Sequence, residues 1–205
     1  MSLLLMKFSI KSVLLPAIFT ISLAMSPAQH KNNIVMFGDS ITYEGNWTES
    51  LGRPDVFNFG ISGDITGTMK KNTNSIVQMQ PKICFIMGGI NDLALNIPVK
   101  DIYENLITIA LQLKSAGVIP VLQSTLFVSE KEFSMYKWNP NVGKLNKMVK
   151  EYCLRNSVEF LDLNAIFARE GTLLPEYTYD GLHLNEKAYS LWREEVHKIL
   201  IKYNI

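Results

Sequence analysis

The stretch IVMFGDS, residues 34–40, is an apolar run that closes with a glycine, an aspartate and a serine. Valine, isoleucine and phenylalanine favour a β-strand, and a run without polar alternation favours a strand that is covered on both faces. Gly38 predicts the end of that strand, so Ser40 stands just beyond it. A serine in this place is either the N-cap of the next helix or a candidate nucleophile.

Four more short apolar runs follow, and helical patterns separate them. Together with the first run at 33–37, we expect strands over 56–59, 83–87, 118–123 and 158–163. Apolar residues recur every three or four positions within 66–80, 102–113, 142–152 and 188–200, which predicts helices there. Strands that alternate with helices predict an α/β fold, in which helices cover both faces of a mostly parallel sheet of about five strands.

Composition and charge are those of one globular domain without a highly charged partner. The chain has 205 residues, 47% of them hydrophobic, and a formal net charge of +1. This size and apolar content suffice for one core. The balanced charge gives no reason to expect nucleic acid or an acidic membrane surface as a partner. The sequence also lacks a Cys and His cluster with metal-ligand spacing, so we expect no metal and no other cofactor.

The chain has two cysteines, Cys84 in a strand-like run and Cys153 in a helical run. Cysteines in an exported chain can form a disulfide. Two buried thiols are the interpretation that the apolar surroundings of both residues favour.

The N-terminal segment 1–28 has the pattern of a secretory signal peptide. Lys7 and Lys11 precede an apolar centre, and small residues lead up to Ala28, after which we predict cleavage. The apolar centre is shorter than the roughly 20 residues that span a membrane, so we expect no stable membrane anchor. A buried N-terminal helix is the alternative. We therefore expect residues 29–205 to form a single exported domain, in the periplasm or outside the cell.

Three polar or glycine-bearing loops follow predicted strands. Ser40 follows the first strand, Gly63 the second and Asn91 the third. The carboxyl ends of parallel strands lie at one edge of the sheet, so these residues should meet there. If the first and third strands are neighbours, Ser40 and Asn91 flank the crevice between them. Each residue alone also fits an ordinary helix cap or turn.

Asp180 and His183 lie between the last predicted strand and the last predicted helix, and can return to the same edge. His183 is the best-placed histidine, because His30 adjoins the expected cleavage site and His197 lies inside the last helix. An imidazole whose pKa is near neutral can take the proton of a serine hydroxyl. Asp180 can hold that imidazole in the required tautomer. We therefore predict a triad of Ser40, His183 and Asp180.

A serine nucleophile that attacks an ester also needs donors for the oxyanion that forms. The backbone N–H groups of Ser40 and Gly63 and the side-chain amide of Asn91 would supply three such donors. Losing one donor of this kind typically slows the reaction about a hundred- to a thousand-fold.

These motifs resemble, in order, the four blocks of the SGNH (GDSL) hydrolases. The match runs over residues 34–184, and its one departure is Ile41 where the GDSL motif has leucine. The four matching segments are FGDS ending at Ser40, the loop around Gly63, GGIND containing Asn91, and DGLH ending at His183.

The resemblance implies a flavodoxin-like three-layer α/β/α sandwich with a sheet in the order 2-1-3-4-5. It also implies serine esterase chemistry, with Ser40 as nucleophile, His183 as base and Asp180 as its partner. Gly63 and Asn91 would be oxyanion donors beside the Ser40 N–H. Within the family, the chain looks most like the small acetylhydrolases akin to platelet-activating-factor acetylhydrolase and like carbohydrate acetylesterases.

A long aromatic segment, Thr125–Pro140, follows the fourth predicted strand, where it would either border a binding site or form a packed surface loop. Aromatic rings can stack on sugars or fill a core. Our predicted substrate contacts are Asp39, Tyr43, Phe127 and Trp138.

The predicted function is an exported serine esterase that acts on a small-molecule or glycan ester. Short acyl groups, above all O-acetyl groups on carbohydrates, are the expected substrates. One alternative is a lysophospholipase or thioesterase with a groove for a longer acyl chain. Another is a non-catalytic glycan-binding module, which would have no need of a complete triad.

Overall fold

Five parallel strands form the central sheet in the order β2-β1-β3-β4-β5, as predicted. The computed structural model describes residues 33–133 and 137–205. The predicted strands are confirmed with shifts of one or two residues at their ends. Their bounds are β1 Ile34–Gly38, β2 Val56–Gly60, β3 Ile83–Met87, β4 Ile119–Gln123 and β5 Glu159–Leu161.

Strand β1 lies between β2 and β3, and this arrangement sets the position of the site. Gly38 at the end of β1 is level with Gly60 on β2 and with Met87 on β3. The chain therefore leaves all three strands at the same height along one edge of the sheet. The chain crosses from β1 to β2 on one face of the sheet and from β3 to β4 on the other, so β1 and β3 flank the topological switch point, where open α/β sheets bind their ligands.

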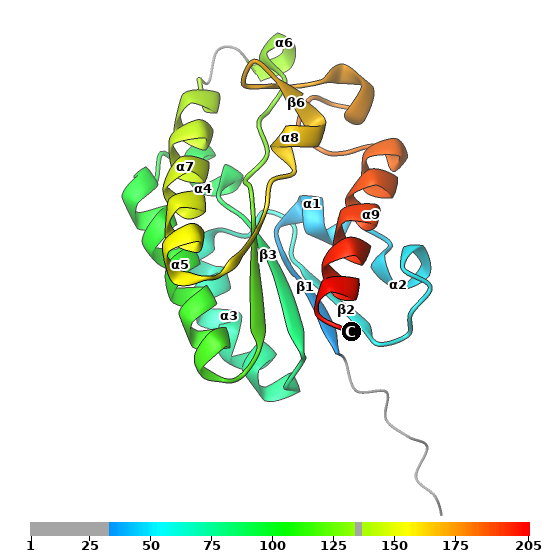
Figure 1. Cartoon of the computed structure of the whole chain (residues 1–205). Helices are drawn as coiled ribbons and strands as arrows, with labels where there is room; N and C mark the ends of the chain where they lie inside the picture. Colours follow the sequence, from blue (N-terminus) through cyan, green and yellow to red (C-terminus); the bar gives the residue numbers. More distant parts are fainter. Residues whose placement is uncertain (1–32, 134–136) are drawn as a thin grey trace, which may run out of the picture.

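Helices cover both faces of the sheet (Figure 1). On one face, α3 packs against α5 and α5 packs against α7. On the other face, α9 lies beside the short helix α2. The bounds are α2 Trp47–Ser50, α3 Thr66–Met79, α5 Val99–Ser115, α7 Asn139–Asn156 and α9 Glu186–Lys202. The four long helices lie where the apolar spacing predicts them.

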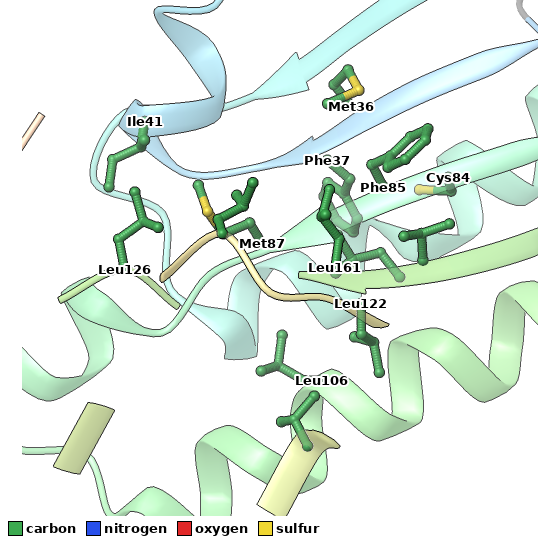
Figure 2. Packing of buried hydrophobic residues seen from close by; sticks show 14 of the residues in the cluster. Met36, Phe37, Ile41, Cys84, Phe85, Met87, Leu106, Leu122, Leu126 and Leu161 are labelled. Carbon is green, nitrogen blue, oxygen red and sulfur yellow. The ribbon is translucent and has the colours of Figure 1, made fainter. Parts of the chain in front are cut away.

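The core consists of the two central strands and the helix faces that cover them. Every residue of β1 and β3 is buried, as expected for strands between two helical layers. Figure 2 shows buried side chains of this core, among them Phe37 of β1, Phe85 of β3, Leu122 of β4 and Leu106 of α5. Both cysteines are buried and unpaired, which confirms two buried thiols.

Several short elements that the sequence analysis did not predict lie between the long ones (Figure 1). Helix α6 lies inside the aromatic segment 125–140, and α7 begins before that segment ends. The unpredicted elements are α1 Ser40–Tyr43, α4 Ile90–Ala94, α6 Glu130–Phe133, α8 Asn164–Phe167, the strands β6 Ala168–Arg169 and β7 Thr172–Leu173, and the 3-10 helix Pro175–Tyr177, besides α2. A helix of four or five residues is too short to display a 3.6-residue period.

The predicted signal peptide, residues 1–28, lies outside the described part of the chain. Among the described residues, no helix is both long and apolar enough to cross a membrane.

Candidate active site

Ser40 is the first residue of α1, directly after β1. Asp39 is the N-cap of this helix, and its carboxylate accepts a hydrogen bond of 3.0 Å from the Ile41 N–H. Gly38 is needed because the chain passes very close to its neighbours at this point. A Cβ on Gly38 would lie 2.2 Å from Thr42 Oγ1 and 2.5 Å from the Met87 carbonyl oxygen. The strand end thus fixes where the Ser40 hydroxyl emerges.

The structure brings Ser40, His183 and Asp180 together. Ser40 Oγ lies 3.0 Å from His183 Nε2, and His183 Nδ1 lies 2.7 Å from Asp180 Oδ2. Ser40 and His183 are 143 residues apart in the sequence, so only the fold makes this contact. A hydroxyl, an imidazole and a carboxylate joined in this order can pass a proton from the hydroxyl to the imidazole.

The loop that carries His183 is held by its own hydrogen bonds. Asp180 Oδ1 accepts from the N–H groups of Leu182 (2.9 Å) and His183 (2.7 Å). Thr178 Oγ1 donates to the His183 carbonyl (2.6 Å) and accepts from the Gly181 N–H (2.8 Å). Gly181 has a φ of 89°, which a glycine adopts without strain. Both carboxylate oxygens of Asp180 are therefore engaged in positioning the imidazole.

Asp180 is ionised in this setting. Burial raises its pKa, but the hydrogen bonds from the His183 ring and from the N–H groups of Leu182 and His183 outweigh burial. The pKa of Asp180 is lower than that of an ordinary aspartate as a result. A charged carboxylate here favours the imidazolium that forms when His183 takes a proton.

The predicted oxyanion donors lie at the same edge of the sheet. Asn91 is in the first turn of α4, and its Nδ2 donates to the Asp64 carbonyl at 2.9 Å. This bond fixes the amide beside the loop that contains Gly63, whose φ is 76°. Among the described residues, the backbone N–H groups of Ser40 and Gly63 have no hydrogen-bond acceptor. They are available to a substrate oxygen.

A buried network beneath this loop was not predicted from the sequence. The Asp92 carboxylate, which has no exposed surface, accepts from Thr66 N (3.0 and 3.1 Å) and from Thr66 Oγ1 (2.5 Å). Asn105 Nδ2 in turn donates to Thr66 Oγ1 at 3.1 Å. The network joins the start of α3 to α4, and so ties the Gly63 loop to Asn91. Burial raises the pKa of Asp92.

Asp39 lies inside the protein and not at the surface that we predicted it to share with the substrate. It was expected to contact substrate, but its side chain is only 1% exposed and caps α1 from inside the protein. Burial raises its pKa to about 7, against the lowering effects of the Ile41 N–H and of the nearby His183, while the charge of Asp92 raises it further.

The other predicted substrate contacts are spread over two areas. Tyr43 ends α1 and is 59% exposed, close in sequence to the nucleophile. Phe127 lies beside Gly143 of α7, in a surface pocket that contains no triad residue. Trp138 stacks on Phe133, with ring centroids 5.6 Å apart. Phe133 in turn lies close to Gly181. Tyr136, which also belongs to the aromatic segment 125–140, falls outside the described residues.

Two further residues beside His183 were missed. The Tyr179 ring stacks on the imidazole, and its hydroxyl donates to the Glu44 carboxylate (3.1 and 3.2 Å). Glu44 Oε1 also lies 4.0 Å from His183 Nε2. Tyr179 directly precedes the DGLH motif that contains Asp180 and His183. This position is the one sequence signal that could have indicated Tyr179. Nothing in the sequence links it to Glu44.

Within residues 33–133 and 137–205, no three side chains of His, Cys, Asp or Glu gather as metal ligands would.

The model of the GDSL-like Lipase/Acylhydrolase family matches residues 36–191, which include every residue of the site described above.

The chain is also similar to individual relatives and solved structures. An N-acylneuraminate cytidylyltransferase from Streptococcus agalactiae serotype III is 25% identical over 164 residues, 78% of this chain. The chain spans only 37% of that protein's length. A solved structure of a Streptococcus pneumoniae protein named for platelet activating factor is 25% identical, with a TM-score of 0.73 over 88% of this chain and 86% of that one. An acetyl xylan esterase, 16% identical, has the same fold, with a TM-score of 0.69 over 82% and 98% of the two chains.

Proposed function

This chain belongs to the GDSL-like lipase/acylhydrolase family of ester hydrolases, and we propose that it is a serine esterase that removes short acyl groups, acetyl above all, from carbohydrates. One observation carries the proposal: the continuous hydrogen-bond chain from Ser40 Oγ through the His183 ring to Asp180. A structural serine would need neither an imidazole at 3.0 Å nor a carboxylate behind it.

The reaction proceeds in two steps through an acyl-enzyme. Ser40 Oγ attacks the acyl carbon while His183 Nε2 takes the hydroxyl proton. The oxyanion is held by the N–H groups of Ser40 and Gly63 and by the Asn91 amide. His183 then gives its proton to the leaving alcohol oxygen, and the acyl group stays on Ser40. Water repeats the sequence as nucleophile, and releases the carboxylic acid and free Ser40.

The choice of a carbohydrate ester has two kinds of support. The fold is shared with an acetyl xylan esterase, whose name gives both an acetyl group and a sugar polymer. Exposed tyrosines at the site, Tyr43 and Tyr179, are side chains on which a sugar ring can stack.

An acyl-chain series tests the proposal. The rate of hydrolysis of p-nitrophenyl esters from acetate to decanoate is measured on the native protein, on Ser40→Ala and on Ser115→Ala, an exposed serine of α5 that serves as the matched control. We expect the rate to fall sharply beyond propionate, and Ser40→Ala to lose at least about a thousand-fold. The control should match the native protein, and circular dichroism should be the same for all three.

Other outcomes would replace the proposal. A rate that rises toward octanoate would indicate a lysophospholipase or a thioesterase. A Ser40→Ala variant that keeps more than a few per cent of the activity would show that Ser40 is not the nucleophile. If the native protein were inactive and a fluorophosphonate failed to label Ser40, the chain would be a non-catalytic binding module.

We also propose that the protein is exported, on the strength of the pattern of residues 1–28. Expression of the full chain in a bacterial host should give a secreted or periplasmic product that starts at Gln29, as determined by N-terminal sequencing. A product that keeps Lys7 and Lys11 would contradict the export proposal.

A further inference from the structure

Glu44 and Tyr179 form a small assembly against the exposed side of the catalytic histidine. The Tyr179 ring is nearly parallel to the imidazole, at an interplanar angle of 12° with centroids 5.9 Å apart. Its hydroxyl donates to both oxygens of the Glu44 carboxylate. Glu44 belongs to the segment after α1, whereas Tyr179 and His183 belong to the loop before α9, so the contact joins the two halves of the triad.

The chemistry of the reaction shows what this assembly would face. His183 Nε2 must reach the leaving alcohol oxygen in order to protonate it. The acyl carbonyl oxygen points toward Gly63 and Asn91, so the alcohol part extends toward groups beside Nε2. Glu44 Oε1, at 4.0 Å from Nε2, is such a group. The leaving alcohol therefore passes close to Glu44 and to the Tyr179 ring.

The charges around this position are negative. Glu44 and Asp180 both lie beside the His183 ring, and the described ion pairs give Glu44 no Lys or Arg partner. Partial burial raises the pKa of Tyr179, and the hydrogen bond and charge of Glu44 and the charge of Asp180 raise it further. The phenol thus stays protonated and keeps donating to Glu44. An anionic alcohol would meet carboxylates on its way to Ser40.

We infer that Glu44 and Tyr179 form the alcohol-binding side of the active site and select a neutral, hydroxyl-rich alcohol over an anionic one. The inference rests on the proposed esterase function and narrows its substrate class. Tyr179 is 63% exposed, so its ring presents an apolar face on which the C–H face of a sugar can stack. The Glu44 carboxylate keeps lone pairs free to accept hydrogen bonds from sugar hydroxyls. Of the two sugars in the relatives' names, a neutral xylan fits this surface and an acidic neuraminate does not.

The test compares two sugar esters with the same acetyl group on the same hydroxyl: a methyl glucoside and a methyl glucuronide. Vinyl acetate, whose alcohol part has no charge, no further hydroxyl group and no ring to stack on Tyr179, reports on the triad. Release of acetate gives kcat/KM for each ester at pH 7.5, in low salt and in 0.5 M NaCl. We expect the native protein to favour the neutral sugar about five- to twentyfold in low salt, and the ratio to fall to about two in high salt.

Three variants separate the parts of the assembly. Glu44→Gln keeps an acceptor for the Tyr179 hydroxyl but removes the charge, so the neutral-to-acidic ratio should fall toward one in low salt. Glu104→Gln removes an equal charge from α5, on the far layer of helices, and should leave the ratio unchanged. Tyr179→Ala should raise KM for the neutral sugar ester at least fivefold, whereas Tyr179→Phe keeps the ring and should raise it less than threefold.

Each outcome bears on one of the two proposals. A native protein inactive on vinyl acetate and on both sugars would overturn the esterase function itself. Activity on vinyl acetate with a neutral-to-acidic ratio near one, or a ratio that Glu44→Gln leaves unchanged, would overturn the inference while the esterase function stands. Activity on vinyl acetate but on neither sugar would also overturn it, because the assembly would then bind no polyol.

Discussion

Asp39 is a carboxylic acid inside the protein, one residue before the nucleophile. Its pKa is about 7, against an ordinary value of 3.8. The folded protein therefore holds a proton on Asp39 over a pH range in which the unfolded chain has released it. By linkage, the stability that Asp39 contributes is fully present below pH 3.8 and is lost as the pH rises through about 7.

We expect Asp39→Asn to remove this loss of stability. An asparagine carries no charge, and its Oδ1 can still accept from the Ile41 N–H as a helix cap. The free energy of unfolding of the variant, relative to the native protein, should be higher at pH 8 than at pH 4, with an upper limit of about 4 kcal/mol. Urea unfolding at pH 4, 6 and 8 measures the difference. A difference that does not change with pH would show that Asp39 is charged in the folded protein.

At the scale of single residues, a role at the site could be predicted from the sequence where the residue type and its position have few other structural explanations. Ser40, Asn91 and His183 were predicted from their positions after strands and before the last helix, and the structure brings Ser40 to His183. The burial of Asp39 was not predicted, because a Gly-Asp-Ser turn looks the same whether its carboxylate faces solvent or the core. The contact of Glu44 with Tyr179 joins residues 135 positions apart and has no local pattern.

At the scale of elements, buried hydrogen bonds at the junction of α3 and α4 connect helix packing to the residues of the candidate site. Asp92 is the residue next to Asn91, and its carboxylate accepts hydrogen bonds from the backbone N–H and from the hydroxyl group of Thr66. The network therefore connects the two groups proposed as oxyanion donors, the Asn91 amide and the Gly63 N–H. Thr66 and Asp92 are fully buried, so we expect them to act by positioning these donors.

Asp92→Ala should lower both stability and turnover. It leaves the Thr66 N–H without a partner in a buried place, which typically costs about 1–3 kcal/mol. We expect the free energy of unfolding to fall by about that amount, and kcat on p-nitrophenyl acetate to fall at least tenfold with KM changed less than threefold. Asn105→Ala, which removes only the outer donor to Thr66 Oγ1, is the matched control and should lose less of both. If the control lost more turnover, the donors would be positioned by α5 instead.

The long elements could be predicted and the short ones could not, for a physical reason. A helix such as α5, with 17 residues, shows its period of 3.6 several times, and a buried strand such as β3 shows an unbroken apolar run. Helices α1 and α6 have four residues each and are formed by caps and by contacts from elsewhere in the chain. Those contacts cannot be predicted from the neighbouring residues in the sequence, although they shape the edge of the site.

For the whole molecule, the site depends on the order of the strands. The order β2-β1-β3-β4-β5 puts β1 beside β3, and the level register of Gly38, Gly60 and Met87 puts the three donor loops side by side. The alternation of elements predicted a parallel sheet, but this order came from the resemblance to a known family. Many orders satisfy the same alternation, and long-range packing selects one of them.

The same packing isolates the two thiols. Cys84 lies on β3 in the centre of the sheet and Cys153 lies on α7, and both are buried. Burial raises the pKa of Cys84, and it raises the pKa of Cys153 to about 12, so neither is a reactive thiolate near neutral pH. On the proposed export route, an oxidising compartment would therefore meet no exposed thiol while the chain is folded.

We expect Ellman's reagent to detect no thiol in the native protein within an hour and two thiols per chain in 6 M guanidinium chloride, without added reductant. The unfolding midpoint should be the same with and without a reductant, because no disulfide constrains the unfolded chain. Ser40→Ala serves as a control for a local change at the site, and should give the same two thiols. A single thiol, or none, after unfolding would mean that oxidation reached the cysteines before the core closed around them, so that folding is slower than export.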